Sequence, residues 1–202
     1  LTDEQKSKAV AVIFYVGTGC SNDSASRTLG VGLKNAGDDS TLTWAPSDTT
    51  GYTTNFTDIQ CMRSETAPTD GTAYYTYTYS NKTYYVTGDF DGSDNWEKVC
   101  TTDSTASANA ATNYTAFNWV NNYANSLTGD MATGWYLPSC VELRILYDNK
   151  DTVNAALEAA GGTKIADRSY WSSSQDSSDK IYAWSVWFND AGRLTYNYKN
   201  NI

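Results

Sequence analysis

The sequence predicts one α+β domain, in which two helices pack on short, mostly antiparallel sheets joined by long loops. Three observations predict this class. Short runs rich in Val, Ile, Tyr, Trp and Thr, which are typical of strands, occupy both ends of the chain. Between them, apolar residues recur at helical spacing. No repeat and no linker rich in Pro or Gly divides the chain, so we expect a single domain over residues 1–202.

The first part of the chain reads as strands. Three are predicted from their apolar and β-branched residues: Val10–Val16, Arg27–Lys34 and Thr41–Ala45. Residues 73–87 then predict a β-hairpin, because alternate tyrosines share one face and Ser80–Lys82 supply a turn.

The middle of the chain changes to a helical period. Four apolar residues recur at helical spacing over about 113–127: Phe117, Val120, Ala124 and Leu127. A second helix begins after Pro138, where Ser139 and Glu142 have the spacing of a capping box. Further helical turns follow from Asp151 and end at Gly161–Gly162.

The chain ends in strands with two different faces. Three strands are predicted: Tyr170–Ser174, Ala183–Asn189 and Arg193–Tyr198, the last two joined by a turn at Asp190–Gly192. Alternation places one set of side chains toward a core: Trp184, Val186, Phe188, Leu194, Tyr196 and Tyr198. The opposite face carries Ser185, Trp187, Asn189, Arg193, Thr195 and Asn197. This second face is either a binding surface built like an antibody paratope or an ordinary polar sheet face with one exposed Trp.

Composition excludes several classes of function. The net charge of −9 disfavours nucleic acids and anionic membrane surfaces as partners. The sequence contains no run of about 18 apolar residues, so we expect no membrane span. The chain contains no His, so nucleophile pairs with His, His general bases and His-ligated metals are excluded. The four cysteines allow three disulfide connectivities, and structural bridges or buried thiols are favoured over a metal site.

One acidic loop has the composition of a calcium site. Residues 88–100 contain four carboxylates in a Gly-containing stretch: Asp89, Asp91, Asp94 and Glu97. The loop lacks the Gly and the final Glu of an EF-hand, so an acidic turn with local Asp hydrogen bonds is favoured over a calcium site. The sequence therefore predicts no cofactor, and calcium at this loop is the alternative.

Two segments carry a family resemblance. GWYLPSCVEL, and then YWSSSQDSSDKIYAWSVWFNDAGRLTYNYKNN, resemble a bacterial surface-domain family with a C-type lectin-like fold of the formylglycine-generating-enzyme type. The family includes the C-terminal domain of the Legionella collagen-like adhesin, treponemal exported proteins and variable proteins of diversity-generating retroelements. Family members usually continue into a final closing strand that pairs with an N-terminal strand. The resemblance therefore implies either that this strand is absent from residues 1–202 or that an N-terminal strand such as Val10–Val16 finds its partner differently.

The resemblance implies a non-enzymatic ligand-binding domain of an exported bacterial surface protein, with a protein or glycan on a host or neighbouring cell as its partner. It also implies a display of variable residues near the C-terminus. Carried over residue by residue, these are Asp176, Asp179, Ser185, Trp187, Asn189, Arg193, Thr195 and Asn197. The alternative is an enzyme, acting on carbohydrate or another substrate, that uses acidic residues of the same scaffold.

Overall fold

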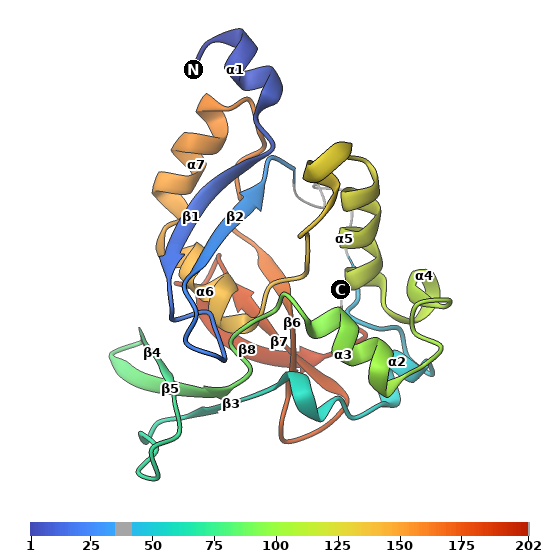
Figure 1. Cartoon of the computed structure of the whole chain (residues 1–202). Coiled ribbons are helices and arrows are strands. Elements are labelled where there is room, and N and C mark those ends of the chain that lie inside the picture. Colours follow the sequence, from blue (N-terminus) through green and yellow to red (C-terminus); the bar gives the residue numbers. More distant parts are fainter. Residues whose placement is uncertain (35–41, 202) are drawn as a thin grey trace.

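The computed structural model describes residues 1–34 and 42–201, and its α+β composition confirms the predicted class (Figure 1). The strands are β1 (Ala11–Gly17), β2 (Arg27–Gly32), β3 (Gln60–Ser64), β4 (Tyr75–Tyr79), β5 (Lys82–Gly88), β6 (Ser169–Asp176), β7 (Tyr182–Trp187) and β8 (Arg193–Tyr198). The α-helices are α1 (Asp3–Lys8), α2 (Thr50–Thr53), α3 (Asn95–Thr102), α4 (Ala110–Asn113), α5 (Thr115–Asn125), α6 (Cys140–Asp148) and α7 (Lys150–Ala159). Two 3₁₀ turns are η1 (Thr57–Ile59) and η2 (Gly129–Ala132).

The described residues form a central six-stranded sheet and a separate two-stranded sheet. The central order is β4-β5-β3-β6-β7-β8, in which β3 and β6 are parallel and the other neighbours are antiparallel. β1 and β2 form the second sheet as an antiparallel pair. In Figure 1 this pair lies between α7 and α5, above the central sheet.

Two apolar clusters cover opposite faces of the central sheet. On one face, Trp184, Val186 and Leu194 pack with the buried residues of α6 and α7. On the other, Ala183 packs with the cluster around Trp44 and Phe117, which joins α5 and α3 to the sheet. Because neighbouring residues of a strand point to opposite faces, β7 is buried on both sides over much of its length.

The two predicted helices are confirmed, with the expected signals at their ends. Helix α5 occupies most of the predicted 113–127. At the start of α6, Ser139 Oγ accepts from the Glu142 amide at 3.2 Å, and the Glu142 carboxylate accepts from the Ser139 amide at 2.8 Å. The turns predicted after Asp151 form the separate helix α7, and Gly161, with φ of 77°, follows its end.

Two sequence interpretations are wrong. Residues 42–45 of the predicted strand Thr41–Ala45 form no strand, and Thr41 lies outside the described residues. Trp44 is instead fully buried, and its Nε1 donates to the Ser172 carbonyl at 2.9 Å. Tyr196 and Tyr198, expected in the core, are exposed, because the apolar cluster under α6 ends at Leu194 and these rings pack against Tyr182.

The structure also bears on whether the chain contains disulfides or membrane-spanning helices. All four cysteines are free thiols: Cys20, Cys61 and Cys140 are buried, and Cys100 is half-buried. In the part of the chain that the structure describes, no helix has both the length and the apolar character needed to cross a membrane.

Candidate ligand-binding site

The last three strands bring polar and aromatic side chains together on one face. The register sets Ser185 between Trp171 on β6 and Thr195 on β8, and Trp187 between Ser169 and Arg193. Alternation therefore gives these residues, with Asn197, one common face. We call it the polar-aromatic face; its members are Ser169, Trp171, Ser185, Trp187, Arg193, Thr195 and Asn197.

Ser185 is the centre of this face. Its Oγ accepts from Trp187 Nε1 at 3.2 Å and from Asn197 Nδ2 at 3.0 Å, and it donates to the Thr195 carbonyl at 3.3 Å. A hydroxyl offers one donor and two acceptor positions, so all three are used. The predicted exposure of Ser185 is wrong: the residue is only 1% exposed. Its role is to orient Trp187 and Asn197.

Trp187 is held from a second side by Arg193. The guanidinium lies 5.6 Å from the centroid of the Trp187 ring and at the same distance from that of Tyr79. Asp190 completes the arrangement, since its carboxylate lies 3.6 Å from Arg193 and accepts from the Tyr79 hydroxyl. The cation–π contacts and the Ser185 hydrogen bond fix the half-buried indole in one orientation.

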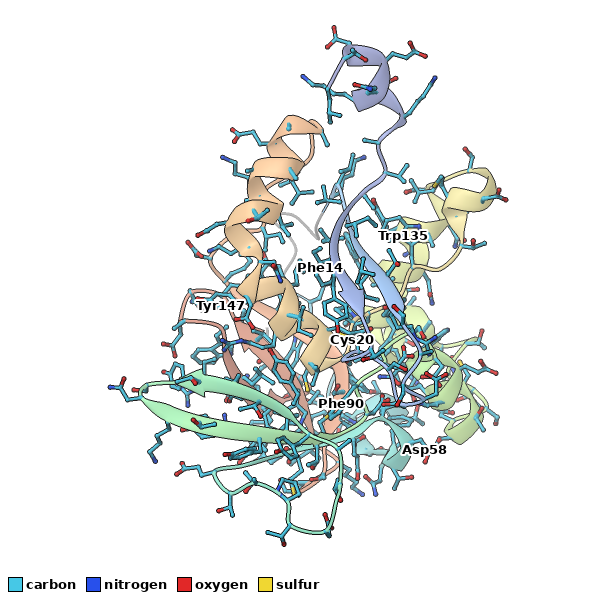
Figure 2. The ribbon with its side chains drawn as sticks, turned by 60° about the vertical axis from the view of Figure 1, so that its left-hand side comes forward. Phe14, Cys20, Asp58, Phe90, Trp135 and Tyr147 are labelled. Atoms are coloured by element: carbon cyan, nitrogen blue, oxygen red, sulfur yellow. The ribbon has the colours of Figure 1, made fainter. Side chains whose placement is uncertain are left out.

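Trp187 and Asn197 line a cavity of about 670 Å³ between this face, the β1–β2 sheet and α5. We call it the aromatic cavity, because rings dominate its walls. The lining rings are Phe14, Trp119, Tyr123, Trp135, Tyr136, Tyr170, Trp171, Trp187 and Phe188. Phe14 on β1 and Trp135, which precedes α6, are labelled in Figure 2.

The wall contributed by α5 was missed in the sequence. Trp119 and Tyr123 are four residues apart, so they share one face of the helix, and their rings stack at 5.7 Å with an interplanar angle of 5°. Trp135 meets Tyr123 edge-on at 4.9 Å. The aromatic pair at helical spacing was visible in the sequence, but its proximity to the β7–β8 strands was not.

The other predicted site residues do not join this site. Asp176 is buried, contrary to the predicted exposure, and its Oδ1 accepts from the Ser178 amide at 2.9 Å. Asp179 is exposed and accepts from the Ile181 amide at 3.2 Å. Both precede β7, at the opposite end of the strand from Trp187. Asn189 is exposed in the β7–β8 turn, and it does not line the aromatic cavity in the described residues.

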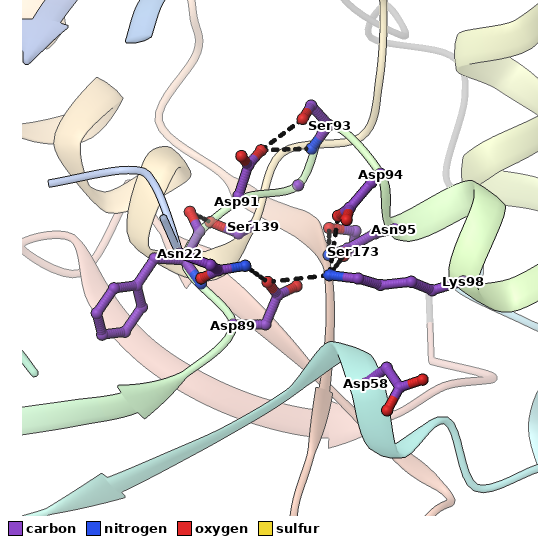
Figure 3. A network of polar contacts seen from close by, with 12 residues as sticks. Asn22, Asp58, Asp89, Asp91, Ser93, Asp94, Asn95, Lys98, Ser139 and Ser173 are labelled. Atoms are coloured by element: carbon purple, nitrogen blue, oxygen red, sulfur yellow. Dashed lines mark hydrogen bonds and ion pairs between the residues drawn. The ribbon is translucent and has the colours of Figure 1, made fainter. Parts of the chain in front are cut away.

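The acidic loop forms a polar network in place of a calcium site (Figure 3). Asp91 accepts from Arg27 Nη2 at 2.8 Å and from the Ser93 amide and hydroxyl. Asp89 Oδ1 accepts from Asn22 and from Lys98 Nζ at 3.4 Å, and Lys98 also contacts Asp94 at 2.8 Å. No group of three carboxylates or thiols able to hold a metal occurs among the described residues, so the suggested ligands Asp89, Asp91, Asp94 and Glu97 are not brought together.

The electrostatics of this network follow from burial. Burial raises the pKa of Asp89, and the hydrogen bonds from Asn22 and Lys98 offset this only in part. Its Oδ2 is buried without a hydrogen-bond partner in the residues described. Burial also acts to raise the pKa of Asp91, but the hydrogen bonds from Ser93 and Arg27 outweigh it and hold that pKa below its ordinary value.

Glu142 is the buried carboxyl that lines the aromatic cavity. Burial raises its pKa to about 7. Its Oε1 accepts from the Tyr136 hydroxyl at 2.9 Å, and its Oε2 accepts from the amides of Ser139 at 2.8 Å and Gly92 at 3.1 Å. These donors occupy both oxygens, so Glu142 ties three segments together and is poorly placed for acid–base chemistry on a ligand.

Comparison of this chain with protein-family models, with curated proteins and with solved structures finds no match in any of the three. Functional inference therefore depends on the geometry of the aromatic cavity and on the residues that position it.

Proposed function

We propose that this chain is a non-enzymatic ligand-binding domain that holds its ligand in the aromatic cavity. One observation carries the proposal: Trp187 and Asn197, two residues expected from the sequence to bind ligand, line a cavity of about 670 Å³ and are both oriented by Ser185. Cavities of some hundreds of cubic ångströms, mostly apolar and with few polar groups, are typical of ligand sites.

The fixed orientation of the rings supports a role in recognition. Trp187 is held by Ser185 and Arg193, and Trp135 Nε1 donates to the Met131 carbonyl at 2.6 Å. Aromatic side chains that are ordered before binding lose little conformational entropy when a ligand arrives. The site therefore combines a large contact area with a small ordering cost.

The wider setting follows from the motif resemblance. We propose a C-type lectin-like fold and a place on the bacterial cell surface, where the domain serves adhesion or recognition. The motif GWYLPSCVEL supplies the capped start of α6, and YWSSS forms the centre of β6, which is consistent with such a scaffold. In the same proposal the C-terminal face is the variable region of a diversity-generating retroelement, with Asp179 and Asn189 as exposed variable positions.

The enzyme alternative receives less support from the site. Of the carboxyl groups that line the aromatic cavity, Glu142 accepts three hydrogen bonds from within the protein and Asp167 pairs with Lys150. Glu142 interacts electrostatically with Asp91 and Cys20, but its hydrogen bonds come from Tyr136 and two backbone amides. The chain supplies no His to replace these carboxyl groups.

The test is a ligand screen on the full chain. Neutral aromatic compounds, mono- and oligosaccharides and short peptides are screened by NMR line broadening, and hits are measured again on Trp187→Ala. We expect at least one hit whose affinity falls tenfold or more in Trp187→Ala, and no chemical change in the bound compound.

The control is Tyr196→Ala, which removes an exposed ring of β8 that lies outside the lining of the aromatic cavity. This variant is expected to bind like the parent chain. Hits that ignore Trp187→Ala would place the binding site elsewhere, and turnover of a hit would support the enzyme.

A further inference from the structure

We infer that the ligand of the aromatic cavity is a neutral, largely apolar small molecule that carries one or more flat rings. This inference rests on the proposed function and names its ligand class. This ligand class differs from the protein or glycan that the motif resemblance favours. The size, the polar groups and the charges of the lining support it.

The size of the cavity fits a small molecule. Its volume of about 670 Å³ lies in the range of small-molecule sites. The walls come from several places in the chain: the β1–β2 sheet, α5, the segment before α6, α6 itself, and parts of β6, β7 and β8. A concave site enclosed on several sides suits a whole small molecule better than the broad surface of a protein partner.

The lining is mostly apolar, and several of its polar groups already have partners within the protein. Trp187 Nε1 and Asn197 Nδ2 both donate to Ser185, and the oxygens of Glu142 accept from three donors within the protein. A sugar carries a hydroxyl on most of its carbons, and each hydroxyl that leaves water without a new partner weakens binding. The lining is therefore poorly matched to a glycan.

The charges of the lining are either exposed to water or already engaged within the protein. Lys34 and Asp167 are exposed, and Asp167 is paired with Lys150. Arg168 is half-buried and has an interaction within the protein. Glu142, the buried carboxyl, is held by neutral donors. A charged ligand would leave water without gaining a desolvated counter-ion, which favours a neutral one.

The arrangement of the lining rings favours a ligand with a flat ring. Trp119 and Tyr123 present one parallel stack, and Trp135 stands almost perpendicular to it at 87° to Tyr123. Trp171 and Trp187 face the cavity from the sheet. A flat ring can stack on one set of rings while its edge meets another, which are the two arrangements that aromatic pairs prefer.

The experiment uses N-phenyl-1-naphthylamine, a neutral two-ring dye whose fluorescence rises in apolar surroundings, titrated into the full chain. We expect one saturable site per chain. Trp119→Ala should weaken the dye tenfold or more, and Tyr196→Ala should leave it unchanged. Naphthalene should displace the dye, whereas maltose and galactose at millimolar concentration should not.

A second variant separates loss of the site from loss of the fold. Val120→Phe adds a ring to the half-buried lining surface of α5, so it fills the cavity without removing packing. It should abolish dye binding while the melting temperature stays within a few degrees of the parent value.

The outcomes distinguish the two proposals. Dye binding that is equal in all three variants would overturn the ligand class, because the dye would then occupy another surface. Displacement of the dye by the sugars would overturn the ligand class while leaving the proposed function standing. Failure of the dye, together with a screen that finds no hit dependent on Trp187, would remove both.

Discussion

At the scale of single residues, Glu142 gives a testable pH dependence. Burial raises its pKa to about 7 from the ordinary 4.5, so the folded state holds the proton more tightly than the unfolded state. The stability that this group contributes is present below pH 4.5 and is lost as the pH rises through about 7. One pKa unit corresponds to about 1.4 kcal/mol, so the loss is measurable.

Glu142→Gln isolates this effect, because Gln keeps a side-chain oxygen for the capping box and removes the charge. Between pH 5 and pH 8 the parent chain should lose stability relative to Glu142→Gln. Urea unfolding of both proteins at several pH values measures the difference in unfolding free energy. A difference that stays constant, or that shifts in favour of the parent chain as the pH rises, would mean that the three donors keep the carboxylate ionised throughout.

Single residues also show what alternation in a strand can and cannot predict. The period of two correctly gave Ser185, Trp187 and Asn197 a common face. It did not predict that Ser185 is buried, because alternation identifies the face of a strand but not what covers that face. The same limit explains Tyr196, which shares a face with the buried Trp184 and is exposed at the edge of the sheet.

At the scale of elements, the turn between β7 and β8 depends on Gly192. Its φ of 67° lies in the left-handed region, and a Cβ there would stand 2.2 Å from the Tyr147 ring of α6. Gly192→Ala should therefore combine backbone strain with a steric clash, and destabilise by roughly 2–4 kcal/mol. It should also weaken binding in the aromatic cavity, because this turn sets the positions of Trp187 and Arg193.

Gly161→Ala is the matched control for this prediction. Gly161 also has a positive φ, of 77°, but a Cβ there would meet nothing within 4 Å. We expect a loss of about 1 kcal/mol, from strain alone, and unchanged binding. Thermal unfolding of both variants measures the comparison. Equal losses in the two variants would show that α6 moves aside and that Tyr147 places no steric demand on the turn.

Elements with local signals could be predicted, and elements defined by distant contacts could not. The start of α6 was predictable because Ser139 and Glu142 lie three residues apart and complete the capping box by themselves. β3 was missed because QCMRS has no clear alternation; it is a strand because β5 and β6 pair with it on both sides. Leu42–Ala45 looked like a strand because Trp44 is apolar, but that ring is buried by packing against α5.

At the scale of the whole molecule, the sequence could not predict that the aromatic cavity exists. Trp119, Trp135 and Trp187 are separated by up to 68 residues, and they line one space because α5 and the β1–β2 sheet pack against the end of the central sheet. Sequence patterns predicted the β7–β8 contribution to this site. They could not predict the opposite wall, since it depends on how whole layers meet.

The reactivity of the four cysteine thiols is a measure of how tightly the whole molecule is packed. All four cysteines are free, and Cys20, Cys61 and Cys140 lie in the apolar core between the sheet and α6. Burial raises the pKa of Cys20 to about 12 and also raises that of the half-buried Cys100. Reactivity should therefore be governed by access: in the native protein Cys100 should be alkylated first, and the three core thiols should react only at the rate of global unfolding. Iodoacetamide labelling followed by mass spectrometry measures this order, and the denatured, unreduced chain should carry four labels. Two labels instead of four would reveal a disulfide, and rapid labelling of Cys61 or Cys140 in the native state would show that α6 opens independently of the sheet.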